Sequence, residues 1–328
     1  MEVDMSGKIN AFFWQPKALL VAVFFCVVSC IPSSNPKPED LPEVAQEFIQ
    51  FEALFYGDLD TPLGEIKVQF PYFFPTQTPD NVWIEKRTDS LQQALYGATK
   101  PLFDKNIPQR VERVLQHVNY YFPKENLPKK TITLLTDVDY SLRAVDADSL
   151  LLISIDTYLG ENHPLYEGIP QYIKNKLTHT HLEAEIIDAL ASRFVLQPRE
   201  RTFLARCIAH GKRLLLHDYF APDIPQNYHI QYTQEQWDWA VDHEETVWRY
   251  FVDNELLFST DENLRFRFLT PGPYSKFYTT LDANSPGRIG QWVGYRIVQA
   301  YQKRTGASLQ QILKTDAQEL LKKSRYNP

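Results

Sequence analysis

The chain has 328 residues, of which 44% are hydrophobic and 23% are charged, a composition typical of a globular protein with a sizeable core. Its formal net charge is −7 and it has no block of lysines and arginines, which argues against a nucleic-acid partner. Because it has only 12 glycines and no glycine-rich phosphate or dinucleotide motif, we expect no bound cofactor.

The first residues are typical of an export signal. Lys8 and Lys17 come before an apolar run over residues 18–28, which is too short to cross a bilayer and matches the hydrophobic region of a signal peptide. The run ends in Val27-Val28-Ser29-Cys30, which resembles the lipobox of bacterial lipoproteins. We predict a signal peptide over residues 1–29, cleavage before Cys30 and acylation of the Cys30 thiol. An uncleaved membrane anchor is the alternative.

Residues 30–40 are polar and rich in proline, so they are expected to form an extended tether between the lipid and the rest of the chain. The lipid bilayer would then be one partner, reached through the acylated Cys30. Position 31 is isoleucine, so the best-known retention signal of inner-membrane lipoproteins, an aspartate, is absent. The sequence predicts a lipid-anchored, periplasm-facing protein of the cell envelope and leaves the choice of membrane open.

Residues 41–328 contain no further linker-like stretch and are expected to form a single domain. In the first part of this domain, the sequence predicts a helix over residues 41–56, irregular aromatic packing over 66–84 and a helix over 111–121 that ends before Pro123. Two strands are expected over 131–136 and 150–155, joined by a turn or hairpin. Further helices are expected over 166–176, 181–195, 200–219, 233–258, 287–304 and 308–322. The predicted fold is α+β, a small N-terminal sheet followed by a mainly helical part.

Cys207 is the one cysteine outside the targeting segment, and it lies in an apolar helical pattern beside Leu204 and Ile208. A single thiol cannot form an intramolecular disulfide. We interpret Cys207 as a buried structural residue.

The segment over residues 178–188 is the part of the chain most suggestive of a metal site. On a helix, His181, Glu185 and Asp188 would share one face, and His210 on the next predicted helix could face them. A zinc peptidase helix needs H-E-x-x-H, but Leu182 stands where the general base would be. A metal held by His181, Glu185 and His210 is one hypothesis, and a solvated polar helix face is the other.

A second cluster, Asp242-His243-Glu244-Glu245, also begins as H-E, but it lacks the second histidine. A charged run on a long helix is usually a solvated face, and we interpret it as such.

Residues 285–298 carry the most ordered local pattern. Ser285 suits a helix N-cap and Pro286 the first helical position. Gly287, Gly290 and Gly294 then form one stripe, which predicts close packing against another helix of the domain or against a partner, so Gly290→Leu should destabilise the protein. Arg288, beside the free amides of the first turn, could also hold an anion.

Three segments together carry a resemblance to a known family. They are Tyr158-Leu-Gly-Glu-Asn-His-Pro-Leu-Tyr-Glu-Gly-Ile-Pro-Gln-Tyr-Ile, Tyr232-Thr-Gln-Glu-Gln-Trp-Asp-Trp, and Ser285-Pro-Gly-Arg-Ile-Gly-Gln-Trp-Val-Gly-Tyr-Arg-Ile-Val. In order and spacing they resemble the gliding-motility lipoprotein GldB, from about residue 40 to the C-terminus. As candidate interaction or packing residues we single out Tyr158, Gly160, His163, Pro164, Ser285, Pro286, Gly287, Arg288, Gly290, Trp292 and Gly294.

The resemblance implies an envelope lipoprotein that serves gliding and the type IX secretion machinery, without enzymatic activity, and with unidentified motility or secretion proteins as partners. That family also resembles, more remotely, zincin-like peptidases. This chain departs from their pattern at Leu182, at Glu185 and at Ala209-His210-Gly211, where a glutamate would precede the glycine. The resemblance therefore implies a degenerate zincin-like scaffold that lost its chemistry.

Three functions follow as hypotheses. The first is a non-enzymatic, membrane-tethered interaction protein. The second is a divergent zinc metallopeptidase that uses His181, Glu185 and His210. The third, suggested by six tryptophans and eighteen tyrosines, is a lipoprotein that binds cell wall or carbohydrate.

Overall fold

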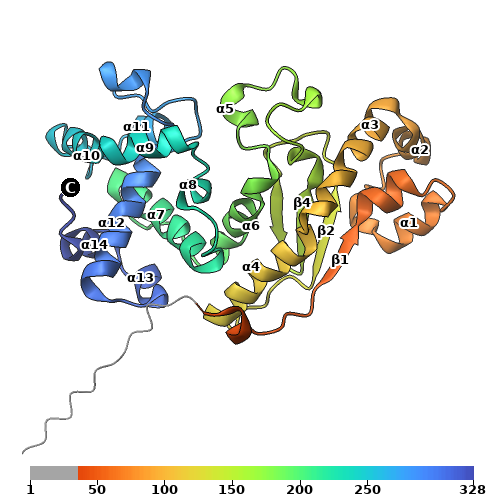
Figure 1. Ribbon diagram of the computed structural model, residues 1–328, viewed down its shortest axis with the longest axis horizontal. Helices are drawn as coiled ribbons and strands as arrows, with labels where there is room; N and C mark the ends of the chain where they lie inside the picture. Colours follow the sequence, from red (N-terminus) through yellow and green to blue (C-terminus); the bar gives the residue numbers. More distant parts are fainter. Residues whose placement is uncertain (1–35) are drawn as a thin grey trace, which may run out of the picture. The chain divides into compact units, whose positions relative to one another are not determined.

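The computed structural model describes residues 36–328 (Figure 1), which belong to one compact unit. The predicted signal peptide and Cys30 lie outside the described residues, and so does most of the tether. Within the tether, Pro38–Asp40 form a short 3₁₀ turn, η1. The boundaries of the single domain expected over 41–328 stay a prediction.

Four strands form a mixed sheet in the order β1-β2-β4-β3. The strands β1 (Glu47–Gln50), β2 (Lys130–Leu134) and β4 (Leu150–Ser154) are parallel, and β3 (Ala144–Ala147) runs antiparallel to β4. The two predicted strands are therefore present as β2 and β4. They pair directly and in parallel, whereas the hairpin expected between them is made by β3, through a tight turn in which Asp148 has a φ of 61°.

The helix predicted over residues 41–56 is wrong. Glu47–Gln50 form β1, which pairs with the edge of β2, and a π-helix, η2 (Ala53–Gly57), follows it. The apolar spacing that suggested a helix is explained by an aromatic cluster, in which the ring of Phe51 lies 5.3 Å from that of Phe70 and 4.7 Å from that of Phe73. Pairing with a distant strand overrode the local pattern.

The irregular packing predicted over residues 66–84 is also only partly correct. The aromatic side chains do pack together there, but the backbone is mostly helical. The elements are α1 (Leu63–Gln69), η3 (Pro71–Phe73), α2 (Asp80–Thr88), α3 (Ser90–Thr99) and η4 (Lys100–Lys105). Two prolines of this segment stand at helix starts, where a missing N–H costs nothing: Pro71 begins η3 and Pro79 is the N-cap of α2.

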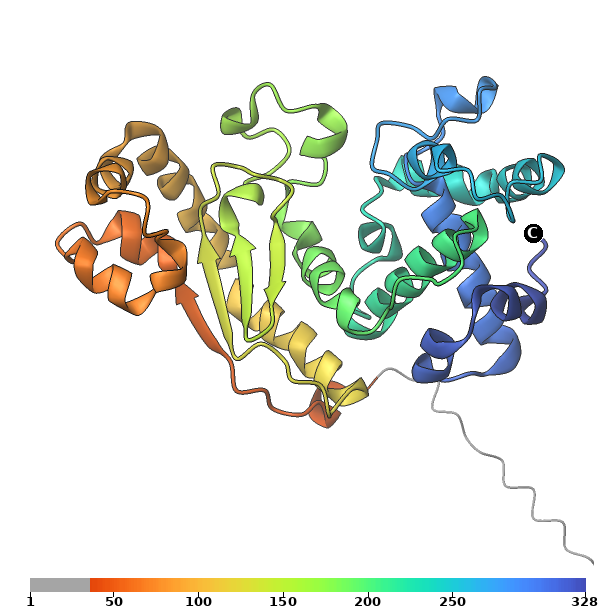
Figure 2. The ribbon, with the colours of Figure 1, turned by 180° about the vertical axis from the view of Figure 1, so that it is seen from behind.

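The long helix α4 (Ile107–Tyr121) ends before Pro123, as predicted, and covers one face of the sheet. It lies in front of the strands in Figure 1 and behind them in Figure 2. Its apolar stripe, which includes Val111, Leu115 and Val118, is fully buried. The α4 helix also contacts α6 (Leu182–Leu190), which packs against β3.

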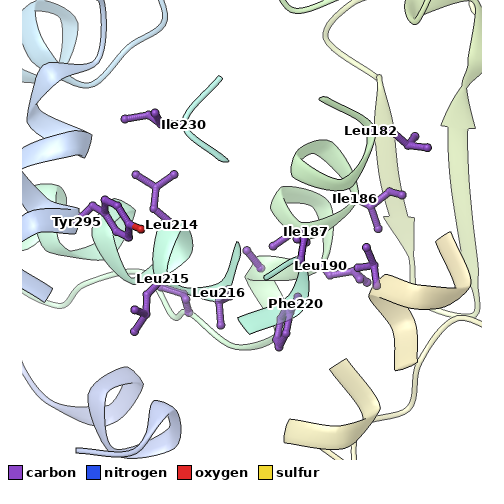
Figure 3. Packing of buried hydrophobic residues seen from close by; sticks show 14 of the residues in the cluster. Leu182, Ile186, Ile187, Leu190, Leu214, Leu215, Leu216, Phe220, Ile230 and Tyr295 are labelled. Atoms are coloured by element: carbon purple, nitrogen blue, oxygen red, sulfur yellow. The ribbon is translucent and has the colours of Figure 1, made fainter. Parts of the chain in front are cut away.

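The α6 helix joins the sheet to the helical part of the unit. Figure 3 shows Leu182 and Ile186 on the side of α6 that faces the strands, and Ile187 on the side toward α7 (Phe203–Phe220). The α7 helix in turn packs along α12 (Ile289–Thr305), the most extensive contact between two helices in the described residues. Cys207 is buried on α7, as predicted.

Among the remaining helices, α8 (Gln226–His229) and α11 (Asn263–Phe268) fall where the sequence predicted no helix, and the others are shorter than the predicted ones. These others are α5 (Gln171–Lys174), α9 (Gln234–Asp242), α10 (Glu244–Asp253), α13 (Leu309–Lys314) and α14 (Ala317–Ser324), with the 3₁₀ turns η5 (Ile155–Thr157), η6 (Pro164–Tyr166), η7 (His179–His181), η8 (Ala191–Arg193) and η9 (Thr280–Ala283).

Two of the predicted helices are split by residues that cap helix ends. The helix predicted over 233–258 breaks at His243, whose Nδ1 lies 2.9 Å from the carbonyl oxygen of Trp239. The helix predicted over 308–322 breaks where Asp316 caps α14. The acidic face predicted at 242–245 is only partly solvated, because Glu244 accepts hydrogen bonds from Arg296 (3.0 Å) and Tyr326 (2.7 Å).

The fold is α+β, a small sheet near the N-terminus followed by a mainly helical part, as predicted. Within residues 36–328, no helix combines the length and the apolar character needed to cross a membrane. The zincin-like character expected from the resemblance stays a prediction.

Candidate functional site

The three segments that carry the family resemblance meet in space, although they are far apart in the sequence. Leu159–Pro164 and Tyr232–Gln234 line one hollow of about 870 Å³. Tyr172 and Arg288 line a second cavity of about 380 Å³, and Gln231 lines both. The second and third segments are tied directly, since the Tyr232 hydroxyl donates a 2.6 Å hydrogen bond to the carbonyl of Gly287. We treat these two hollows as the candidate functional site.

The first segment is held by its own backbone contacts. Gly160 has a φ of 110°, a conformation that favours glycine, and its N–H donates to the carbonyl of Leu177 at 2.9 Å. His163 caps η6, with its Nδ1 accepting from the N–H of Leu165, and Pro164 begins that turn. Tyr158 is buried, and its hydroxyl donates to the carbonyl of Arg143. These residues shape the larger hollow and connect it to the smaller cavity.

The smaller cavity is lined by charged residues from several elements. Lys176 follows α5, Glu185 and Asp188 lie on α6, Arg143 precedes β3, and Arg288 precedes α12. Tyr140, Ser141, Tyr172, Ile173, Gln231 and Pro271 complete the lining. Three cations and two carboxylates thus face one space.

Arg143 and Glu185 form an ion pair in which both side chains are nearly buried, 11% and 12% exposed. Gln231 also donates to the Glu185 carboxylate. A second nitrogen of Arg143 donates to the carbonyl of Lys176 at 3.0 Å. The Glu185 carboxylate is therefore already bound by Arg143 and Gln231, and Arg143 links it to the loop that follows α5.

Lys176 and Arg288 lack the carboxylate partner that Arg143 has. Among residues 36–328, neither forms an ion pair with a carboxylate, and the ammonium of Lys176 makes no hydrogen bond. Burial, together with the nearby Arg288 and Arg143, holds the pKa of Lys176 well below its ordinary value of 10.5. Arg288 is 9% exposed, and burial lowers its pKa as well.

The start of α12 differs from the prediction. Ser285 is not the N-cap and Pro286 is not the first helical residue. The helix begins at Ile289, and Arg288 is the N-cap, with a left-handed φ of 64°. Ser285 and Pro286 are instead held by Ser275, whose hydroxyl donates to the carbonyl of Pro286 at 2.7 Å. Arg288, just before α12, lines the smaller cavity, and its guanidinium donates to the carbonyl of Ile230.

The glycine stripe is only partly as predicted: Gly290 and Gly294 lie on α12 and pack inside the domain, whereas Gly287 precedes the helix and packs against a loop. A Cβ on Gly294 would lie 1.8 Å from the carbonyl oxygen of Cys207 on α7. A Cβ on Gly290 would lie 2.9 Å from Leu269, and one on Gly287 would lie 2.2 Å from the carbonyl oxygen of Gly272. Trp292, on the same helix, is fully buried. The close contact between α7 and α12 therefore fixes the position of Arg288.

His181, Glu185 and His210 do not come together as the metal hypothesis requires. His181 lies in η7, before the first residue of α6, so it does not share the helical face of Glu185 and Asp188. It lines the larger hollow, whereas Glu185 lines the smaller cavity and is bound to Arg143. No group of three histidine, cysteine, aspartate or glutamate side chains in residues 36–328 is placed to hold a metal ion.

Burial explains the state of both histidines. It lowers the pKa of His181 to about 3, with Arg143 and Lys176 contributing, and the pKa of His210 to about 4. Both imidazoles are therefore neutral at neutral pH. The Nδ1 of His181 has no hydrogen-bond partner in the described part of the chain, and its ring packs edge-on against Tyr228.

Sequence reasoning missed several residues of the site. Arg143 and Lys176 stand in segments with no motif, and Gln231 has a left-handed φ of 55° that no pattern predicted. Asp188 was seen, but not its partner His217 on α7, whose Nε2 lies 3.2 Å from the Asp188 carboxylate. Two signals pointed to this cavity: the anion-binding role suggested for Arg288, and the polar face that included Glu185 and Asp188.

Comparison with known families decides what this chain is related to. Residues 33–328 match the family model described as gliding motility protein GldB. The chain belongs to the GldB family. No curated protein and no solved structure showed significant similarity to it. The GldB match spans every element of the fold, including the three segments that meet at the candidate site.

Proposed function

We propose that this member of the GldB family is an envelope lipoprotein, anchored through acylated Cys30, which supports gliding and type IX secretion by binding a partner rather than by catalysis. The family membership supports the link to gliding. The observation that carries the binding role is the meeting of all three family-like segments at two adjoining hollows. The segments that carry the family resemblance therefore line a ligand-sized space, which is where a recognition site would be expected.

Two features favour binding over peptidase chemistry. Leu182, which stands where a zinc peptidase has its general base, is fully buried in the core. Glu185, which stands at the position of the second metal ligand, is held by Arg143 and Gln231 and would have to break these contacts to coordinate a metal. The peptidase alternative is tested by measuring zinc in the full-length protein, purified without a histidine tag. Stoichiometric zinc that is lost in His181→Ala would contradict the non-catalytic proposal.

The lipid anchor is tested by labelling cells with palmitate. Cys30→Ala should abolish incorporation of the label, because the lipobox thiol is the site of acylation. Cys26→Ala is the matched control, since Cys26 lies in the same apolar segment, and it should be labelled like the wild type. Normal labelling of Cys30→Ala would contradict the assignment of the anchor.

The binding role is tested by purifying the full-length protein from membranes in mild detergent. Envelope proteins of the motility or secretion machinery should copurify with it. Their absence after crosslinking in intact cells would contradict an interaction role in that machinery.

A further inference from the structure

The charges around the smaller cavity do not cancel. Arg143, Lys176 and Arg288 face it together with Glu185 and Asp188, so the lining carries one excess positive charge when Lys176 is protonated. Arg143 is balanced by Glu185, and Asp188 is hydrogen-bonded to His217 on the neighbouring helix. The excess charge therefore rests on Lys176 and Arg288.

The arrangement of these two cations destabilises the folded protein. Arg288 contacts a carbonyl, that of Ile230, and lies 5.9 Å from the centre of the Tyr232 ring, and neither contact neutralises its charge. Burial and repulsion from both arginines lower the pKa of Lys176, and the attraction of Glu185 and Asp188, which also acts on Arg288, does not offset them. A buried charge without a partner destabilises a protein, and an anion in the cavity would remove that penalty.

The lining also favours one kind of anion. A dianion such as phosphate would face the carboxylates of Glu185 and Asp188, whereas a monoanion matches the single excess charge. The guanidinium of Arg288 presents a planar fork of N–H groups that suits a carboxylate. Tyr140, Tyr172 and Pro271 provide apolar surface beside these charges, on which the organic part of a ligand could pack.

We propose that this cavity binds a carboxylate group between Arg288 and Lys176, carried by a small organic acid or by the C-terminal end of a peptide. The proposal rests on the binding role given above. A peptide would continue past Gln231 into the larger hollow, which offers amide and hydroxyl groups such as those of Asn227, Thr233 and Gln234.

The test measures binding to the full-length lipoprotein in detergent micelles by calorimetry. The probes are N-acetylphenylalanine, an acetylated hexapeptide that ends in phenylalanine, the carboxamide of each, and inorganic phosphate. Both free acids should bind, and the carboxamides should bind at least about tenfold more weakly, because they keep the shape and lose the charge. Phosphate should bind more weakly than the acids. Tighter binding of the hexapeptide acid assigns a peptide end, and equal binding of the two acids assigns a small acid.

Lys176→Met and Arg288→Gln should each weaken binding of the acids about tenfold or more. Lys174→Met, on α5 two residues away and outside the cavity lining, is the matched control and should bind like the wild type. Because Lys176 has no partner to lose, Lys176→Met should also raise the melting temperature, by roughly 2 °C. A structural role for Lys176 would lower it instead.

Equal binding of acids and carboxamides, absence of binding by either acid, or unchanged affinity in both cavity variants would overturn the proposal. If that happens while envelope proteins still copurify with the wild type and with Lys176→Met, the carboxylate site is wrong and the interaction role stands.

Discussion

Two regions of this domain each contain a largely buried arginine, but only one of the two arginines is paired with a carboxylate. Next to the sheet, Arg193 follows α6 and binds Asp146 through two nitrogens, at 2.5 and 2.6 Å. It also donates to the carbonyls of Asn126 and Asp148, both at 2.7 Å. In the cavity, Arg288 contacts a carbonyl and an aromatic ring but pairs with no carboxylate of the described residues.

The pKa values of the two arginines record the difference. The hydrogen bond with Asp146 is the main reason that the pKa of Arg193 is raised, whereas burial lowers the pKa of Arg288. A fully paired arginine stabilises the fold that surrounds it. An unpaired arginine next to an unpaired lysine costs stability, and such a cost is typical of sites that act on another molecule. The comparison therefore distinguishes a cluster that stabilises the fold from the cavity that is proposed to bind a ligand.

The largest expected effect concerns the helix contact that keeps Arg288 in place. In Gly294→Ala the new Cβ would overlap the backbone of Cys207, so α7 and α12 would have to move apart. We expect the free energy of unfolding to fall by about 4 kcal/mol. Urea denaturation measures it.

Gly97→Ala in α3 is the matched control for that measurement. Beyond its own helix backbone, no atom lies within 4 Å of the place that the new Cβ would take, so the substitution should be neutral or stabilise the protein by about 0.5–1 kcal/mol. If Gly294→Ala unfolds like the wild type, α12 is not rigidly held, and Arg288 could turn to find a partner.

The glycine stripe and α4 show what the sequence could predict. Periodic apolar residues, a proline stop and the spacing of three glycines are local signals, and each corresponds to a real helix or contact. The strands β2 and β4 were visible for the same reason, because their β-branched and apolar residues are continuous in the sequence.

The cavity and β1 show what the sequence could not predict. The β1 strand exists because β2 offers it an unpaired edge, which lies more than eighty residues away in the chain. Arg143, Lys176 and Arg288 become neighbours only through the packing of α5, α6 and α12. Arg143 and Lys176 look like ordinary surface residues in their own segments, and only Arg288 stood out in the sequence. The prediction that His181, Glu185 and Asp188 share one helical face was wrong, because His181 lies in η7, just before α6 begins.

The next largest effect concerns the paired region. Arg193→Met leaves the Asp146 carboxylate, 12% exposed, without its partner, and should lower the free energy of unfolding by about 3 kcal/mol. Arg249→Met breaks the exposed pair with Glu245 and should cost no more than about 0.5 kcal/mol. Guanidinium denaturation of the two variants measures the difference. A similar, small loss in both would mean that the pairing of Arg193 does not distinguish it from a surface residue, and the comparison with Arg288 would lose its basis.

The smallest expected effect on stability concerns a buried acid, Glu52, and extends the comparison of paired and unpaired charges. Glu52 is fully buried beside Thr133, whose hydroxyl lies 2.8 Å from its carboxylate, and no cation is paired with it in the described residues. Burial is the main reason that the pKa of Glu52 is raised from 4.5 to about 7; the hydrogen bond with Thr133 opposes the shift, and the nearby Asp156 adds to it. Tyr96 also lies within electrostatic reach of Glu52.

Because the folded state holds the Glu52 proton more tightly than the unfolded state, stability falls as the pH rises from about 4.5 through 7. Between pH 5 and 8 the wild type should lose about 2 kcal/mol more than Glu52→Gln, which cannot ionise. Glu47→Gln, at the exposed start of β1, should follow the wild type. Melting curves across this range measure the slopes. Parallel curves for the wild type and Glu52→Gln would mean that ionisation of Glu52 does not lower the free energy of unfolding. Burial alone would then not make a charge destabilising in this fold. The cost assigned to Lys176 and Arg288 would then need the binding measurements to support it.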